Sequence, residues 1–332
     1  MAGALRIAVP LLLVAAVALA PLADPTSRVL LTLALAKGLA VLGIVVLLQA
    51  GQVSFGHALY FAVSAYAAAF LGHRLGGGEL LLMLVAGTLG ALVVGVVVGL
   101  FVVRYRYIFF GMLNLAVSMI FFSILEKFYY LTGGSDGMQV ARPLVLGVET
   151  GREAFETLLF YLTLVLCLAA AWGTHRFLNS PIGNMMRAIK TNEVRLEYLG
   201  VSARRVLLVG YALSAALGGL GGALTAVAQG IVTPEYAFWV RSGEFVFIAI
   251  LGGSGSVGGA FVGALIYEAV RTYAAAFAAD VWQMILGVVL LVVILFRPSG
   301  VVGAWVEARD RLGKRAGGRG TPAGRAERRA AE

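Results

Sequence analysis

The chain has 332 residues, of which 60% are hydrophobic and 13% are charged, and its mean hydropathy is +0.92. A soluble domain averages about 45–50% apolar and 25% charged residues, so this composition excludes a large soluble all-helical protein and indicates a polytopic membrane protein. The net charge of +9 could suggest nucleic acid, but the placement of the basic residues, described below, argues otherwise.

The predicted spans of the first half follow one another closely. A membrane-crossing helix needs roughly 20 apolar residues. The stretches near this length are 5–23, 29–50, 57–75, 79–103 and 107–131. The first also resembles a cleaved signal peptide, but its apolar part is long for one, so we expect a retained helix. Lys37 lies near the middle of the second stretch, where a lysine usually pairs, snorkels or faces the bundle interior.

The segment Gly51–Ala58 interrupts this apolar region. It holds two glycines, a serine, a glutamine and a histidine within eight residues, which predicts a break rather than one straight span. Gly51 and Gly56 are its predicted structural glycines. Polar side chains at a break, or one turn apart on a helix, bond between helices or contact a transported solute. The substrate-path candidates are Gln52, Ser54, His57, Asn114 and Ser118.

A glycine-rich, net acidic insertion at 132–156 separates these spans from the next. We predict helices at 155–178 and 206–229, with a water-soluble stretch, 179–205, between them. The second helix is crowded with glycines, which predicts close packing against neighbouring backbone. These are Gly218, Gly219, Gly221 and Gly222.

The last apolar regions are interrupted as well. Residues 244–273 contain a glycine-rich break at 252–259 and are predicted to form two short helices or a re-entrant pair. A final span at 280–296 precedes a basic tail, 301–332, which is predicted to be disordered, so the membrane domain is expected to cover 1–300. The single cysteine, Cys167, allows neither a disulfide framework nor a cysteine metal site.

The two interruptions share a pattern. Gly51-Gln-Val-Ser-Phe-Gly-His-Ala58 and Gly253-Ser-Gly-Ser-Val-Gly-Gly-Ala260 both read G-x-x-S-x-G-x-A. Such segments at corresponding places in two halves point to a transporter's substrate pathway. The alternative is a chance match in a chain with 43 glycines. The structural glycines predicted for the second interruption are Gly252, Gly253 and Gly258.

Basic residues gather at 104–106, at 176–205 and in the tail. The positive-inside rule places such clusters in the cytoplasm, which leaves the acidic insertion outside. The sequence therefore predicts an all-α transmembrane bundle of about ten passes, with a cytoplasmic C-terminus. This orientation explains the excess positive charge. We expect the tail to touch anionic lipid and no nucleic acid to be bound.

The energy source must lie outside this chain. The sequence has no phosphate-binding loop of the form G-x-x-x-x-G-K-[ST], so ATP hydrolysis is not expected. Few acidic residues lie inside the spans, which weakens a proton-coupled carrier. The stretch 179–205 is predicted to form a short amphipathic helix from Pro181 to Gly200 that docks a soluble subunit. The alternatives are an interfacial helix and an ordinary charged loop.

Five segments, in order along the chain, resemble the motifs of one family. They are Gly51-Gln-Val-Ser-Phe-Gly-His-Ala58, Leu131-Thr-Gly-Gly-Ser-Asp-Gly137, Ala188-Ile-Lys-Thr-Asn-Glu-Val-Arg-Leu-Glu-Tyr-Leu-Gly-Val201, Ile250-Leu-Gly-Gly-Ser-Gly-Ser256 and Phe296-Arg-Pro-Ser-Gly300. Together they resemble LivM-type permeases, the membrane subunits of branched-chain amino acid ABC transporters. Leu196, Arg195 and Tyr198 depart from that pattern in the docking segment, and Ile44 and Gln49 depart from it before the first break.

The resemblance implies a LivH-like second permease, two cytoplasmic ABC ATPase subunits and a periplasmic substrate-binding protein. ATP would be bound by the partners, with no cofactor or metal in this chain. The ATPases would dock on 179–205, where the candidates are Arg187, Lys190, Asn192, Glu193, Glu197 and Gly200.

The favoured function is an importer subunit for branched-chain or related amino acids, working by alternating access. One alternative is an importer subunit for urea, amides or other amino acids. Another is a stand-alone secondary carrier or channel, which transport by this chain alone would favour. No nucleophile–base set, paired carboxylates or metal cluster supports an enzyme.

Overall fold

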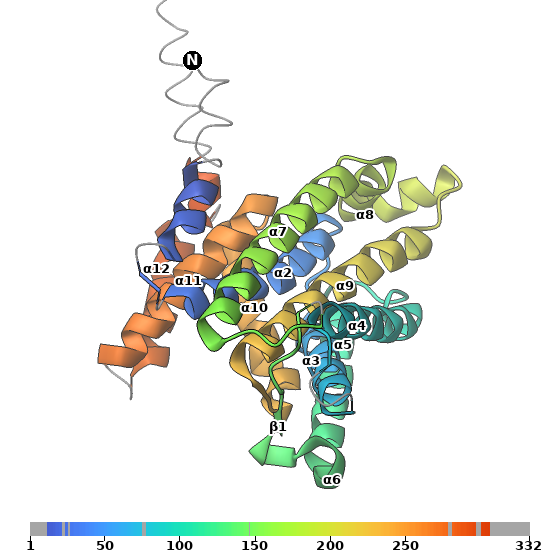
Figure 1. The fold of residues 1–332 in the computed structure, drawn as a ribbon. Coiled ribbons are helices and arrows are strands. Elements are labelled where there is room, and N and C mark those ends of the chain that lie inside the picture. The colour runs from blue at the N-terminus through green and yellow to red at the C-terminus, as the bar shows by residue number, and fades with distance from the viewer. Residues whose placement is uncertain are drawn as a thin grey trace, which may run out of the picture.

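The computed structural model describes residues 12–21, 24–25, 27–74, 78–145, 147–277, 281–296 and 300–305. These residues are mostly helical (Figure 1). After an apolar helix at Leu12–Pro21, the long helices are α2 (Ser27–Gln49), α3 (His57–Arg74), α4 (Leu80–Val102), α5 (Tyr107–Lys127), α7 (Arg152–Leu178), α8 (Pro181–Tyr198), α9 (Ala203–Gln229), α10 (Trp239–Gly252), α11 (Val257–Phe277) and α12 (Trp282–Phe296). The short elements are α6 (Tyr129–Thr132), η1 (Gly134–Asp136), β1 (Met138–Gln139), β2 (Ile231–Val232) and η2 (Pro234–Ala237).

Among the described residues, five helices are long and apolar enough to cross a membrane: α2, α4, α5, α7 and α9. The pair α10 and α11 passes the same test together but is bent by 113° at the break between them, which gives at most a sixth span. The predicted all-α polytopic fold is confirmed.

The expected count of about ten passes is not supported. That count took 244–273 as two short helices that cross twice or dip in and return, but α10 has only 14 residues and the bent pair supplies one span at most. The helix Leu12–Pro21 and the apolar part of α12 are also shorter than the roughly 20 residues that a crossing needs. The rest of the first predicted helix, and residues 306–332 of the tail, lie outside the described residues.

Helices α2 and α9 form the centre of the bundle. Both are buried along most of their length and pack against each other. α2 is also covered by α7 and α11, and α9 by α3 and α4. An apolar helix that is buried on all sides shows no amphipathic period, and α2 has none.

The glycines of α9 let neighbouring backbones approach closely, as predicted. A Cβ added at Gly222 would collide with the backbone of Phe61 in α3, and one at Gly221 with the carbonyl oxygen of Ala36 in α2. Small residues on α4 work in the same way, since a Cβ at Gly95 would collide with that of Ala215. Close contact of this kind supplies the van der Waals attraction that holds membrane helices together.

The two ends of the bundle differ. At one end, β1 from the insertion 132–156 pairs antiparallel with β2, with Met138 opposite Val232. At the other end, α8 joins the end of α7 to the start of α9 (Figure 1). The basic stretch 179–205 and the acidic insertion therefore lie at opposite ends, as the positive-inside argument requires.

Candidate functional site

The first interruption follows α2 and precedes α3. α2 ends at Gln49, and Gly51 takes a left-handed φ of +72°, where a side chain would be strained. A Cβ at Gly51 would lie 3.1 Å from Cγ of Lys190 in α8, so the turn packs directly on that helix. At Gly56, a Cβ would lie 2.6 Å from the carbonyl oxygen of Asn114 in α5. Both predicted glycines are therefore required by local geometry.

The end of the interruption lies beside the middle of α9. His57 Nε2 is 2.6 Å from Ser214 Oγ, and the Ser214 hydroxyl donates to the Gly43 carbonyl at 2.6 Å. Because that hydroxyl has one proton, His57 must donate to it from Nε2. Ser214 is 11 residues after Ala203 and 15 before Gln229, or about 16 and 22 Å from the two ends of α9. Non-helical backbone at this depth must be buried in protein or line a water-filled cavity.

A second set of polar groups lies beside the break. Tyr60 and Tyr211 bond through their hydroxyls, and the Tyr211 hydroxyl donates to the Asn114 side-chain oxygen. Nδ2 of Asn114 donates to the Phe110 carbonyl at 2.8 Å. The chain of bonds joins α3, α9 and α5, and His57 packs edge-on against Tyr60.

The structure brings four of the five substrate-path candidates together around the break and places Ser118 apart. Gln52, Ser54, His57 and Asn114 are all buried. Ser54 Oγ accepts from the Gly56 N–H at 3.3 Å, while Ser118 Oγ donates to the Ala237 carbonyl at 2.8 Å. Each candidate thus bonds within the chain: the Ser54 bond lies inside the break, and the Ser118 bond reaches a neighbouring element. The one polar atom left over is His57 Nδ1, which is buried without a partner among the described residues.

The second interruption shares two features with the first: a glycine with a positive φ, and a serine that accepts from a backbone N–H. α10 ends at Gly252, Gly253 has a φ of +109°, and Ser256 Oγ accepts from the Gly259 N–H at 2.9 Å at the start of α11. A Cβ at Gly252 would collide with the carbonyl oxygen of Gly259. Gly258 differs, since a Cβ there meets nothing within 4 Å. The contact role predicted near this position belongs to Gly259.

A direct bond joins the end of the first interruption to the first turn of α10. The Ala58 N–H, in the first turn of α3, donates to Ser242 Oγ of α10 at 2.9 Å. A free N–H in the first helical turn needs such a partner when it is buried. The start of α3 is therefore held by the bent pair α10–α11.

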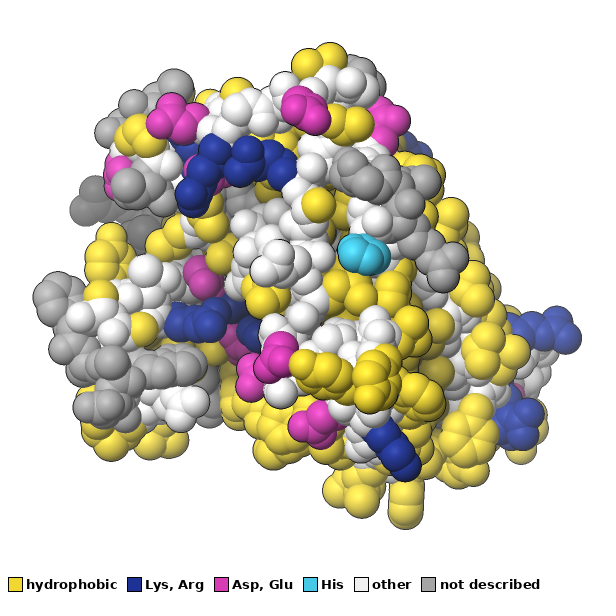
Figure 2. Space-filling model, turned by 60° about the horizontal axis from the view of Figure 1, so that its bottom comes forward, with side chains coloured by type: hydrophobic (Ala, Val, Ile, Leu, Met, Phe, Trp, Pro, Cys, Tyr) yellow, Lys and Arg dark blue, Asp and Glu magenta, His cyan; other side chains and the backbone are white. Residues whose placement is uncertain are grey.

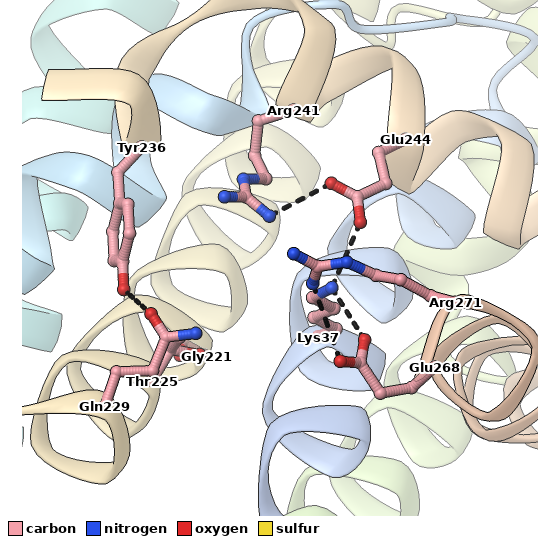
Figure 3. A network of polar contacts seen from close by, with 9 residues as sticks. All are labelled: Lys37, Gly221, Thr225, Gln229, Tyr236, Arg241, Glu244, Glu268 and Arg271. Atoms are coloured by element: carbon pink, nitrogen blue, oxygen red, sulfur yellow. Dashed lines mark hydrogen bonds and ion pairs between the residues drawn. The ribbon is translucent and has the colours of Figure 1, made fainter. Parts of the chain in front are cut away.

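A buried charge network lies on the same bent pair (Figure 3). Lys37 Nζ of α2 is 3.0 Å from Glu244 Oε1 of α10 and 2.7 Å from Glu268 Oε2 of α11. Lys37 also lies over the Tyr267 ring, 5.3 Å from its centroid. Lys37 stands 10 residues after the start of α2 and 12 before its end, so the network is near the middle of the span. The pairing expected for Lys37 is confirmed.

Two arginines complete the network. Arg241 Nη1 is 3.1 Å from Glu244 Oε2, and Arg271 Nη1 is 3.5 Å from Glu268 Oε1. Sequence reasoning gave Arg241 and Glu244 no role. Their spacing of three residues in an otherwise apolar stretch was the available signal. On the face drawn in Figure 2, charged side chains gather in a few places, one of them a hollow where basic and acidic groups adjoin.

The predicted docking helix, α8, begins at Pro181 as expected, and Ser180 Oγ accepts from the Gly183 N–H at 3.4 Å. The helix is kinked at Asn192, whose φ of −161° and ψ of 97° are not helical. Asn192 Oδ1 accepts from the Arg195 N–H at 3.0 Å and so caps the second half. The first half is amphipathic and packs Met186 and Ile189 into the bundle.

The second half of α8 protrudes and carries exposed apolar side chains. Tyr198 is 86% and Leu199 is 75% exposed, and Val194 is exposed beside them. We call Val194, Tyr198 and Leu199 the α8 tip. Gly200 follows with a left-handed φ of +80°. Sequence reasoning did not name the tip residues as docking candidates, although exposed apolar side chains on a polar helix are a recognised sign of an interaction surface.

The charged docking candidates fall into two groups. Arg187, Lys190 and Glu197 have exposed side chains, although Arg187 also donates to the Leu178 carbonyl. Glu193 is half-buried, and its carboxylate binds the Arg106 guanidinium before α5. Glu197 therefore remains available to a partner, whereas Glu193 is held within the chain.

Five or six apolar spans, two interruptions between helices and buried polar groups around the first define a polytopic membrane protein. Such glycine-rich interruptions are typical of transporters. Residues 28–294 match the family described as "Branched-chain amino acid transport system / permease component", and the chain belongs to this family.

Curated relatives include both kinds of permease. The chain is 28% identical to the LivM permease protein of Escherichia coli K12, over 76% of this chain and 64% of that protein. It is 26% identical to the LivH permease protein of Salmonella typhimurium, over 76% of this chain and 86% of that protein. It is 24% identical to a probable LivM protein of Methanocaldococcus jannaschii, over 68% of this chain and 69% of that protein. The chain thus spans less than two thirds of the length of the E. coli LivM protein. No solved structure matches it.

Proposed function

We propose that this chain is the transmembrane permease subunit of an ABC importer that moves branched-chain amino acids, or related ones, into the cytoplasm. The observation that carries the proposal is the family match over 28–294, which covers the bundle from α2 to α12. The names of the relatives supply the substrate class. On this proposal the chain is not an enzyme and does not itself bind ATP.

The partners follow from the same proposal. They are a LivH-like second permease, two cytoplasmic ATPase subunits that bind ATP, and a periplasmic substrate-binding protein. The similarity of this chain to both LivM and LivH proteins supports a partner of the same fold. The α8 tip supports the docking of a soluble subunit, because its apolar side chains lack cover among the described residues.

The orientation places α8 in the cytoplasm of a bacterial cell and the insertion 132–156 on the outer side. Residues 1–300 form the membrane domain, and the basic tail 301–332 is cytoplasmic, where it can contact anionic lipid. Movement of substrate requires the interrupted helices to separate, because the polar candidates around the first break are bonded to other groups of the chain. Gln52, Ser54, His57, Asn114 and Ser118 contact substrate only when those bonds open.

Replacing Leu199 with aspartate tests the docking. We expect co-purification of the ATPase subunits to fall about tenfold or more, since a buried charge at the contact costs at least the 1.4 kcal/mol that tenfold represents. The measurement is the amount of ATPase recovered with a tagged permease complex in detergent.

The matched control is Val148→Asp, at an exposed apolar residue in the insertion at the opposite end. We expect it to leave ATPase recovery unchanged. Equal recovery with Leu199→Asp, or an equal loss with both variants, would contradict docking at the α8 tip. This experiment tests docking and does not depend on the substrate. If the substrate were urea or an amide, the ligand of the binding protein would reveal it.

A further inference from the structure

A charged bond ties α8 to the segment before α5. Arg106 Nε is 2.7 Å from Glu193 Oε2, and Arg106 Nη2 is 2.7 Å from Glu193 Oε1. Two parallel bonds of this kind fix direction as well as distance. Arg106 Nη1 also donates to the Val103 carbonyl, and to that of Tyr105 at 2.9 Å. The guanidinium is thus fixed to its own segment and to α8, so a displacement of Glu193 also displaces Arg106.

The next residue, Tyr107, has an unusual backbone. Its φ is +54°, the one positive value at a non-glycine residue in the part of the chain described. A bulky residue rarely adopts this region without an outside constraint. The Tyr107 side chain is 73% exposed and makes no hydrogen bond that would hold it there. Its N–H donates to Gln52 Oε1 at 3.0 Å, so the backbone is held between Arg106 on one side and Gln52 on the other.

Gln52 belongs to the first interruption. It is buried, and its Nε2 donates to the Ala50 carbonyl at 3.3 Å. Its side-chain amide therefore bridges the turn after α2 and the start of α5. The turn after α2 also contacts α8 directly, where Gly51 packs on the Lys190 side chain. Two contacts, one from each side of the Asn192 kink, connect α8 to the break.

The kink places these contacts at the point where α8 changes direction. Glu193 is the first residue after Asn192, and the α8 tip follows it. Before the kink, Met186 and Ile189 are packed in the bundle. After it, Leu196 is buried, whereas the residues of the α8 tip are exposed. A force on the tip therefore acts on Glu193 before it reaches the packed half of the helix.

We propose that Arg106, Tyr107 and Gln52 are positioning residues that transmit movement of the α8 tip to the first interruption. When Glu193 pulls Arg106, Tyr107 leaves its left-handed conformation and releases Gln52, and the break separates from α5. Substrate passage is thereby coupled to the docked ATPase. This inference rests on the proposed function, since it requires a nucleotide-hydrolysing subunit on α8.

The test is a charge exchange in the full complex in liposomes, with amino acid import and ATP hydrolysis measured together. Arg106→Glu and Glu193→Arg, each alone, are expected to lower import per ATP hydrolysed about tenfold, while the ATPase subunits still co-purify. The double exchange is expected to restore the ratio to within about twofold of the unmodified complex. The control exchange, at the pair Arg152 and Glu156 at the start of α7, is expected to change nothing.

Tyr107→Gly provides a second test if the charge variants do not fold. Glycine adopts φ of +54° without strain, so the thermal midpoint should stay or rise, whereas import per ATP should fall several-fold. A purely structural role would not lower coupling while preserving stability. Normal coupling in Tyr107→Gly, or a double exchange no better than the single ones, would overturn the proposal. An unmodified complex without ATP-dependent import would instead contradict the proposed function itself.

Discussion

Replacing Lys37 with methionine is expected to destabilise the bundle by about 3–5 kcal/mol, the usual cost of removing one partner from a buried ion pair. Lys37 bonds two buried carboxylates, on α10 and α11, and methionine leaves both with only their arginine neighbours. The measurement is a denaturant titration of the purified protein in detergent, followed by a signal that reports helix packing.

The double variant Lys37→Met, Glu268→Gln tests the cause of that loss. Removing a carboxylate together with the lysine is expected to recover more than half of the stability, because pair removal is often close to neutral. Lys127→Met, at an exposed lysine, is the control and should change stability by no more than about 0.5 kcal/mol. If Lys37→Met behaved like the control, the network would have no structural role.

The second large effect is expected at Gly222. Alanine there would place a Cβ 2.7 Å from the Phe61 carbonyl carbon and closer still to its oxygen, so α3 and α9 must separate. Overpacking of this kind costs about 1–3 kcal/mol, and backbone atoms cannot rotate away as a side chain could. We expect a lower thermal midpoint and weaker assembly of the permease.

Gly173 in α7 is the matched control, because a Cβ there meets nothing within 4 Å. Gly173→Ala should leave stability unchanged or raise it by up to about 1 kcal/mol, since alanine favours a helix interior. Both substitutions replace glycine with alanine, but the expected changes in stability have opposite signs. A gain in stability at Gly222 would show that α3 and α9 are not packed through their backbones.

The parts of the fold that were predictable have local signals in the sequence. Both interruptions were predicted from glycines with polar neighbours. The signal was reliable because Gly51 and Gly253 adopt backbone angles that other residues avoid. Proline at 181 and glycine at 200 bounded α8 for similar reasons. Lys37 was expected to pair, because an isolated charge at the middle of a span is costly.

The parts that were missed depend on distant contacts. The sequence around Lys37 gives no indication that its partner is Glu244, which lies 207 residues away. Tyrosine does not signal a left-handed backbone, so the strained Tyr107 and its bond to Gln52 could not be foreseen. The α8 tip was missed because charge, rather than exposed apolar surface, guided the choice of docking residues. The pass count failed because apolar length alone cannot show whether the two short helices in 244–273 each cross the membrane or together form one bent span.

The central claim is that this chain moves amino acids only when partner subunits hydrolyse ATP, and uptake into liposomes tests it most directly. The liposomes hold this chain, the second permease and the two ATPase subunits, with the binding protein and labelled leucine, isoleucine or valine outside. The account predicts uptake with ATP inside, and none with ADP or without the ATPase subunits. Uptake by this chain alone, without ATP or partners, would contradict it and identify a stand-alone carrier or channel.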